Sequence, residues 1–158
     1  MQMISPSLRN KVTKFIFLDS IASNPILSGS QEVIDFLIND VSTFLYMPED
    51  RIVSQGEQGD SLFLIAKGEC SVSVIDHMRR NHHVRKLKQG EYFGEVSILN
   101  STPRTATVKS SNYCTMAVLN KKTFFELCNS FPEIILKMRE KALTYDDPWK
   151  KFKKKVLE

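Results

Sequence analysis

The middle of the chain alternates between apolar and polar residues with a period of two, in short runs separated by turns. This is the pattern of a β-strand, because successive side chains of a strand point to opposite faces. Short strands broken by turns at regular intervals are typical of a β-roll or a jelly-roll barrel. The pattern begins at Phe44, and a polar stretch at residues 78–81 is interpreted as a hairpin tip. The apolar positions that mark the strands are Leu62, Leu64, Ala66, Cys70, Val72, Val74, Val84, Leu87, Ala106, Val108, Cys114, Met116 and Val118.

Helices are expected before this roll. Apolar residues recur there at helical spacing, and Asn24-Pro25 interrupts them because the residue before a proline is pushed out of the helical conformation. Ser28, with Gln31 three positions later, has the form of a capping box. Residues 5–42 are therefore expected to form two or three short helices.

Helices are also expected after the roll. Asn120 is a suitable N-cap. Phe131-Pro132 ends the helix that follows and begins another, since proline suits the first helical position. The sequence thus predicts an α+β fold, an antiparallel β-roll of the jelly-roll type with helices at both ends. Its expected parts are N-terminal helices at 5–42, the roll with C-terminal helices at 43–146, and a basic tail at 147–158.

The composition is that of a single soluble domain. With 158 residues, 42% of them hydrophobic and 25% charged, the chain has room for a sizeable core. It has no apolar run of about 18 residues that would span a membrane. Its N-terminus lacks the basic and apolar regions of a secretory signal. Cys70, Cys114 and Cys128 fall in apolar patterns, and we interpret them as reduced core residues of a cytoplasmic protein.

The formal net charge of +4 is attributed to the C-terminal tail, where five lysines crowd between residues 150 and 155. Without the tail the body is close to neutral, so we expect no nucleic-acid-binding face. The default interpretation of the tail is a solvated, disordered end. Because Trp149 and Phe152 accompany the lysines, contact with anionic lipid or with a partner is the alternative.

One segment, residues 90–108, combines a tight turn, an acid and an arginine around a short apolar run. Gly94 has no Cβ, so its backbone can approach a bound group closely. Val96 to Leu99 are expected to form one helical turn, whose free N–H groups and positive dipole end attract an anion. Arg104 is placed to pair its guanidinium with phosphate oxygens. Glu95 would repel phosphate, and it suits a hydroxyl such as a ribose 2′-OH.

These residues carry a family resemblance. Phe93-Gly94-Glu95-Val96-Ser97-Ile98-Leu99, followed by Pro103-Arg104-Thr105-Ala106-Thr107-Val108, resembles the phosphate-binding cassette of the cyclic nucleotide-binding domain family. Upstream, Pro48 and then Ile52 to Gly68 resemble the first signature of that family. One departure is Glu49-Asp50, since the family usually has glycine after the proline. The resemblance covers residues 20–145.

The resemblance implies a sensor of cAMP or cGMP, which is a regulatory ligand and not a cofactor. It implies that Arg104 binds the phosphate, that Glu95 binds the ribose, and that the last helix closes as a lid. Thr105 either lies at the ligand or is only a β-former. Base contacts in this family come largely from the last helix, where Lys141 and Tyr145 lie one turn apart. The implied ligand-binding residues are Phe93, Gly94, Glu95, Val96, Ser97, Arg104, Thr105, Ala106, Lys141 and Tyr145.

Metal binding and catalysis find no support in the sequence. His82 and His83 are adjacent on a strand and point to opposite faces, so they and His77 do not easily share one ion. This spacing also argues against a cupin-like enzyme on a similar roll. No serine or cysteine lies in a nucleophile motif, and no pair of acids has a recognisable catalytic spacing. We therefore expect a binding protein and not an enzyme.

The N-terminal helices, Leu8 to Leu27, resemble the end of the linker between pore and sensor in hyperpolarisation-activated and cyclic nucleotide-gated channels. This implies a cytoplasmic fragment close to a membrane but not spanning it. It would be coupled in cis to an ion channel pore or another effector, in a possible homotetramer. The alternatives are a regulatory subunit of a cyclic nucleotide-dependent kinase and a transcription regulator of the catabolite-activator type. The latter would append a helix-turn-helix, whereas the lysine tail follows the sensor here.

Overall fold

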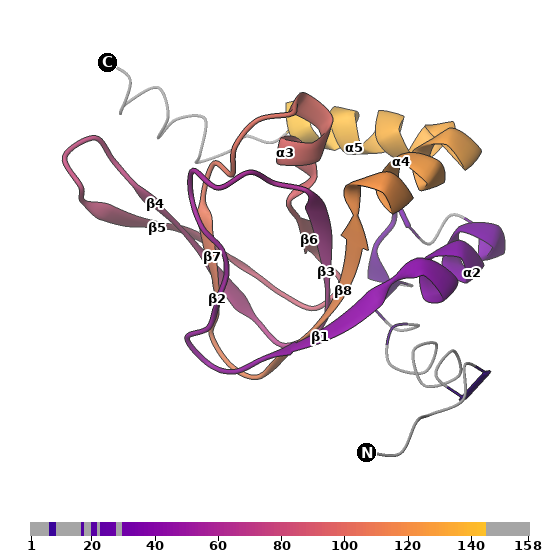
Figure 1. The fold of residues 1–158 in the computed structure, drawn as a ribbon, viewed down its shortest axis with the longest axis horizontal. Helices are drawn as coiled ribbons and strands as arrows, with labels where there is room; N and C mark the ends of the chain where they lie inside the picture. The colour runs from indigo at the N-terminus through magenta and orange to yellow at the C-terminus, as the bar shows by residue number, and fades with distance from the viewer. Residues whose placement is uncertain (1–6, 9–16, 18–19, 22, 28–29, 145–158) are drawn as a thin grey trace.

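Two antiparallel four-stranded sheets face each other, and helices cover the outer side of one of them (Figure 1). This arrangement is that of a computed structural model, which describes residues 7–8, 17, 20–21, 23–27 and 30–144, without the side chains of Asn100 and of residues 141–144. The first sheet has the strand order β1-β8-β3-β6, and the second has the order β2-β7-β4-β5. The prediction of an α+β fold built on an antiparallel β-roll is confirmed.

Within the described residues, the helices lie before the first strand and after the last one, apart from the short α3 between β6 and β7. The strands are β1 (Ser42–Tyr46), β2 (Arg51–Val53), β3 (Ser61–Lys67), β4 (Cys70–Ile75), β5 (Asn81–Leu87), β6 (Tyr92–Phe93), β7 (Thr107–Ser110) and β8 (Cys114–Asn120). The helices are α2 (Gln31–Asp40), α3 (Glu95–Asn100), α4 (Lys121–Ser130) and α5 (Pro132–Thr144).

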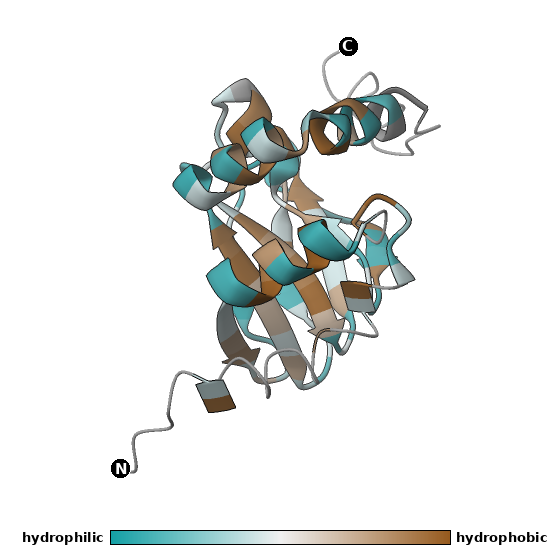
Figure 2. Cartoon of the chain, turned by 90° about the vertical axis from the view of Figure 1, so that its right-hand side faces the viewer, coloured by the Kyte–Doolittle hydropathy of each residue, from teal (hydrophilic) through white to brown (hydrophobic). Residues whose placement is uncertain are grey.

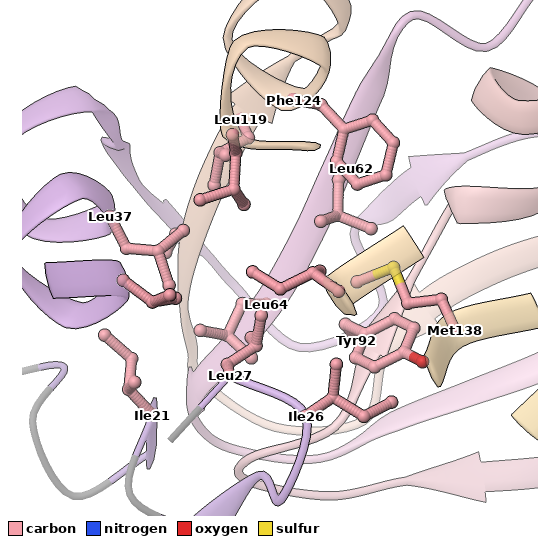
Figure 3. Close-up of a cluster of buried hydrophobic side chains, with 14 of the residues drawn as sticks. Ile21, Ile26, Leu27, Leu37, Leu62, Leu64, Tyr92, Leu119, Phe124 and Met138 are labelled. Carbon is pink, nitrogen blue, oxygen red and sulfur yellow. The ribbon is translucent and has the colours of Figure 1, made fainter. Parts of the chain in front are cut away.

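Strand β3 separates two hydrophobic cores. Phe63 and Ile65 point between the two sheets, whereas Leu62 and Leu64 point towards the helices, as expected for the two faces of a strand. The described residues 17, 20–21 and 23–27 are called the N-terminal segment. On the helix side, side chains from this segment, α2, α4 and α5 pack on the first sheet (Figure 3). The helices that cover this sheet turn their hydrophilic sides outwards (Figure 2). A strand buried on both faces therefore holds the helices and the second sheet in one body.

The N-terminal segment is also hydrogen-bonded to the roll. The Ser20 hydroxyl donates to the Ala66 carbonyl at 2.6 Å. Asn24 Nδ2 donates to the Gly90 carbonyl at 3.0 Å, and Asn24 is 3% exposed. Because Gly90 lies in the turn that leads into β6 and α3, this segment is joined directly to the chain that carries the cassette.

Most helix boundaries follow the sequence predictions, and one cap differs. Asn120 caps α4, its side chain accepting from the Thr123 N–H at 2.8 Å, and α5 starts at Pro132. The cap of α2 is Ser30, whose hydroxyl accepts from the Val33 N–H at 3.2 Å. The capping box at Ser28 was therefore wrong, because the helix starts two residues further on.

Two further expectations concern the domain boundaries and the lysine tail. The domain boundaries drawn at residues 42 and 146 stay predictions, and the lysine tail lies outside the described residues. Among the helices that the structure describes, none combines the length and the apolar character needed to cross a bilayer.

Candidate ligand-binding site

The cassette begins at a glycine that no other residue could replace without strain. Gly94 follows β6 and has φ 97°, in the left-handed region. A Cβ at this position would lie 2.6 Å from Arg104 Nη1 and 2.8 Å from the Ser61 carbonyl oxygen. Gly94 is the N-cap of α3, and no side chain caps the helix there. A helix start presents backbone N–H groups and the positive end of the helix dipole, and both favour a bound anion.

Arg104 places a guanidinium at this helix start. Only 7% of the residue is exposed. Its Nη1 donates to the Gly94 carbonyl at 3.0 Å, and its Nη2 donates to the Ser61 carbonyl at 2.8 Å. Its Cζ lies 5.8 Å from the ring centroid of Phe63, within the range of a cation–π contact. The side chain is thus held in place by β3 on one side and by the cassette on the other.

The charge of Arg104 is not neutralised by a direct ion pair. Within the described part of the chain, no carboxylate comes within 4.0 Å of the guanidinium. Burial lowers the pKa of Arg104, while the negative charges of Asp60, Glu57 and Glu95 act in the opposite direction. An arginine nevertheless stays protonated at neutral pH. A buried cation beside a helix N-terminus is an electrostatic site for a small anion.

The loop before β3 packs directly on this site. A Cβ on Gly59 would lie 2.4 Å from the Ser97 Cβ and 2.8 Å from Arg104 Cζ. The backbone around Arg104 is tied to the same loop, since the Arg104 N–H donates to the Glu57 carbonyl at 2.7 Å and the Gly56 N–H donates to the Arg104 carbonyl at 2.8 Å. Sequence reasoning included Gly59 in a family motif but gave it no role in the site. The glycine just before Asp60-Ser61, at the start of a strand, was the available signal.

The other expected ligand residues are placed in several environments. Phe93 is buried between the sheets, and its ring stacks on Phe63 with centroids 5.0 Å apart. Glu95 and Val96 lie in the first turn of α3, where Val96 is 36% exposed, and Ser97 is 4% exposed. Half-buried Thr105 and Ala106 follow Arg104. Phe93 therefore lies in the core between the sheets, Glu95, Val96 and Ser97 belong to α3, and Thr105 and Ala106 follow Arg104 in the chain.

The two residues expected to reach the base belong to the end of the last helix and to the sequence directly after it. Lys141 belongs to α5, but its side chain is not described. Tyr145 lies outside the described residues. Their approach to a ligand stays a prediction.

The histidines and cysteines occupy separate places. His82 Nε2 lies 2.7 Å from Asp76 Oδ2, in the β4–β5 hairpin. The described residues contain no cluster of three or more His, Cys, Asp or Glu that could hold a metal ion. Cys70, Cys114 and Cys128 are free and buried, and burial raises the pKa of Cys128 to about 11.

Comparisons with known proteins identify the family. A family model described as the cyclic nucleotide-binding domain matches residues 44–131. The cAMP-dependent protein kinase regulatory subunit of Blastocladiella emersonii is 32% identical over 120 residues, which are 75% of this chain and 29% of that protein. The potassium/sodium hyperpolarization-activated cyclic nucleotide-gated channel 4 of Oryctolagus cuniculus is 26% identical over 130 residues, which are 82% of this chain and 11% of the channel. This chain therefore spans less than a third of either relative.

A solved structure is similar over most of the fold. The regulatory domain of Toxoplasma gondii PKA, crystallised with cAMP, matches with a TM-score of 0.75 and 27% identity, over 88% of this chain and 51% of that one. The resemblance to the family is confirmed, and with it the expectation of a binding domain and not an enzyme. Kinase regulatory subunits match this chain with higher identity than the channel does, so the comparison favours the kinase alternative over the channel expectation.

Proposed function

Because this chain belongs to the cyclic nucleotide-binding domain family, we propose that it is a cytoplasmic regulatory sensor that binds a 3′,5′-cyclic nucleotide at the start of α3. The first candidate ligand is cAMP. The observation that carries the proposal is the buried Arg104. Its described partners are the Gly94 and Ser61 carbonyls and the Phe63 ring, without a carboxylate. A guanidinium has five N–H donors, so two bonds to carbonyls leave donors for a phosphate. The support is therefore both electrostatic and geometric.

The nucleotide has a distinct partner for each of its parts. The cyclic phosphate is proposed to accept from the N–H groups of the first turn of α3 and from Arg104, where its single negative charge offsets the buried cation. Glu95, in the same turn, is proposed to accept from the ribose 2′-OH. Thr105 follows Arg104 directly, and its hydroxyl is proposed to lie at the phosphate or at the base. Lys141 and Tyr145 are proposed to reach the base from the last helix.

The signal is proposed to be the position of the last helix. Ile134 and Met138 of α5 are buried in the same core as Leu62 and Tyr92. Tyr92 is followed by Phe93 and Gly94, so a displacement of the cassette backbone would also displace Tyr92 in the core on which α5 packs. Binding moves this equilibrium only by the difference in affinity between the two positions of the helix.

The effector is proposed to be a protein kinase, with the chain acting as part of a regulatory subunit. The support is the 32% identity to a cAMP-dependent protein kinase regulatory subunit. Channel gating is the second candidate, because the match to a channel covers 82% of this chain. Adding the purified chain to a kinase catalytic subunit distinguishes them. Inhibition that cAMP relieves supports the kinase, whereas a kinase that neither binds the chain nor changes its activity contradicts the kinase as the effector.

Calorimetric titration of the purified chain with cAMP and with cGMP tests the proposed binding. Arg104→Lys keeps the charge but cannot reproduce the planar fork, so affinity should fall at least tenfold. Arg104→Ala leaves the phosphate without its buried partner, which costs ~2–5 kcal/mol, or at least ~30-fold in affinity. Arg51→Lys, at an exposed position of β2, is the matched control and should bind like the parent.

Arg104 also supports the fold through its two carbonyl bonds, so each variant is first checked by thermal unfolding. The lysine variant is the more conservative of the two and keeps the test informative if the alanine variant does not fold. Absence of binding by the folded parent, or unchanged affinity in a folded Arg104 variant, would contradict the proposal.

A further inference from the structure

The segment from β4 to β5 is more basic than any role in nucleotide binding requires. Residues 75–88 contain five Arg and Lys, namely Arg79, Arg80, Arg85, Lys86 and Lys88, against the single carboxylate of Asp76. This local excess is as large as the formal net charge of the whole chain, +4. The body that the sequence analysis treated as nearly neutral is therefore polarised, with a second basic segment besides the tail.

This hairpin extends beyond the sheet to which it belongs. Strand β4 pairs with β7 only from Cys70 to Ser73, whereas its pairing with β5 continues to Ile75 and Asn81. The last part of the hairpin is thus a two-stranded ribbon. Figure 1 shows it reaching out on the side of the molecule away from the helices. A protruding ribbon presents its tip to a surface and offers no groove to a partner.

Hydrogen bonds in the turn hold the Asp76 carboxylate against the backbone, whereas other side chains of the tip are exposed. Asp76 Oδ1 accepts from the Met78 N–H at 2.8 Å and from the Arg80 N–H at 2.9 Å, and the Asp76 side chain is only 6% exposed. Arg79 has φ 62°, which turns the chain back at the tip. Met78 is 62% exposed and Ile75 is 50% exposed. Asp76 Oδ2 also lies 3.5 Å from Arg80 Nε, but the Arg80 side chain stays 66% exposed. The outer surface of the tip is therefore apolar and cationic, with its one carboxylate buried beneath Arg80.

Protection of a sheet edge explains only part of this pattern. Strand β5 is the edge of the second sheet, and charged residues on an edge strand prevent pairing with other chains. That account covers Arg85 and Lys86, which lie on β5. It does not cover Arg79 in the turn, nor exposed Met78 and Ile75, which would favour association rather than prevent it.

We propose that the β4–β5 hairpin docks the domain on an anionic lipid bilayer. Met78 and Ile75 enter the boundary between headgroups and acyl chains, while Arg79, Arg80 and the basic residues behind them face the lipid charges. Interfacial elements combine exposed apolar residues with Lys and Arg in this way, and their binding depends on both. An acidic protein segment would use the cations but would leave the apolar tip without a partner. The ligand site lies on α3 and Arg104, outside the hairpin.

Vesicle flotation with the full chain tests this proposal. The parent should bind vesicles of phosphatidylcholine mixed with phosphatidylserine and should not bind phosphatidylcholine alone. Each cation near such a surface contributes roughly fivefold to binding, so Arg79→Gln with Arg80→Gln should weaken binding by roughly 25-fold. Met78→Ser changes no charge and should also weaken binding. Thermal unfolding confirms that each variant is folded.

The tail provides the matched control, because it is the other basic segment. Lys153→Gln with Lys154→Gln removes the same charge and should weaken binding less than the hairpin pair. A loss confined to the tail pair, or binding by the hairpin pair equal to that of the parent, would overturn the proposal. So would a parent that ignores anionic vesicles but binds polyglutamate through residues 75–88, since the partner would then be an acidic protein.

Discussion

At the scale of single residues, the site depends on the close approach of backbone to the Arg104 guanidinium. The Arg104 guanidinium donates to the Gly94 and Ser61 carbonyls, and Gly59 lies directly against it. Two glycines are needed because the loop before β3 and the start of α3 both come within van der Waals distance of the same guanidinium. The position of the charge is therefore set by backbone from two distant parts of the chain.

Adding a methyl group to Gly59 should disturb ligand binding more than it disturbs the fold. In Gly59→Ala, the new Cβ would meet the Ser97 Cβ at 2.4 Å and Arg104 Cζ at 2.8 Å, so α3 or the guanidinium must shift. We expect at least a tenfold loss of cAMP affinity by calorimetry. Overpacking of this kind also costs ~1–3 kcal/mol of stability.

Gly56→Ala is the control for this prediction. Gly56 lies in the same loop with φ +88°, and a Cβ there would meet nothing within 4 Å. This variant keeps the N–H that donates to the Arg104 carbonyl, so it should lose stability through backbone strain but lose less affinity than Gly59→Ala. Equal affinities for the parent and a folded Gly59→Ala variant would show that the contact does not position Arg104.

Sequence reasoning identified the residues of the cassette but not what they contact. The spacing of Gly94, Glu95 and Arg104 indicated an anion site, and the structure places Arg104 against the carbonyl of Gly94. The contacts of Arg104 with Ser61 and Phe63 join positions more than 40 residues apart. Such contacts depend on the pairing of the strands, and a local pattern carries no information about them.

At the scale of elements, the turns and caps were predicted best where a single residue type decides the geometry. Asn120 and Pro132 mark α4 and α5 because an N-cap and a first helical position have strict requirements. The start of α2 was misplaced because Ser28 and Ser30 offer the same hydroxyl, and the helix uses that of Ser30. The hairpin tip was expected from its polarity, but the role of Asp76 within it was not.

The β4–β5 turn should respond to acid at an unusually low pH. The His82 side chain, the Arg80 and Met78 N–H groups and the Arg80 charge lower the pKa of Asp76 to about 2, while burial acts in the opposite direction. A carboxylate whose pKa is lowered on folding contributes stability above its unfolded pKa, near 3.9, and loses it as the pH falls through the folded value. We therefore expect the turn to be fully formed above about pH 4 and to loosen towards about pH 2.

Amide chemical shifts of Met78 and Arg80 measure this transition. In the parent they should titrate with a midpoint near 2, following the Asp76 carboxylate that accepts from both amides. Asp76→Asn keeps an acceptor oxygen but cannot titrate, so its shifts should stay constant over the same range. A midpoint at the ordinary aspartate value would mean that the turn does not hold the charged form.

At the scale of the whole molecule, the N-terminal segment, the roll and the last helix share one core. Ile21, Leu64 and Met138 belong to the same buried cluster (Figure 3). Asn24 adds a polar link, since its side chain donates to Gly90 and accepts from the Ile26 and Leu27 N–H groups. A change at the cassette therefore has two physical routes outwards, through Tyr92 to α5 and through Gly90 to the N-terminal segment.

Hydrogen exchange with and without cAMP should show both routes. Protection should rise in residues 93–106 and in α5, because ligand binding stabilises the closed position of the last helix. A smaller rise is expected in residues 20–27, which are joined to the Gly90 turn by the Asn24 side chain. Asn24→Ala removes the link and should abolish this smaller rise while leaving protection of the cassette intact. If α5 exchanges equally with and without nucleotide although calorimetry shows binding, the last helix is not the moving part. The signal must then leave through the N-terminal segment, and Asn24→Ala should weaken the response of the effector more than it weakens nucleotide binding.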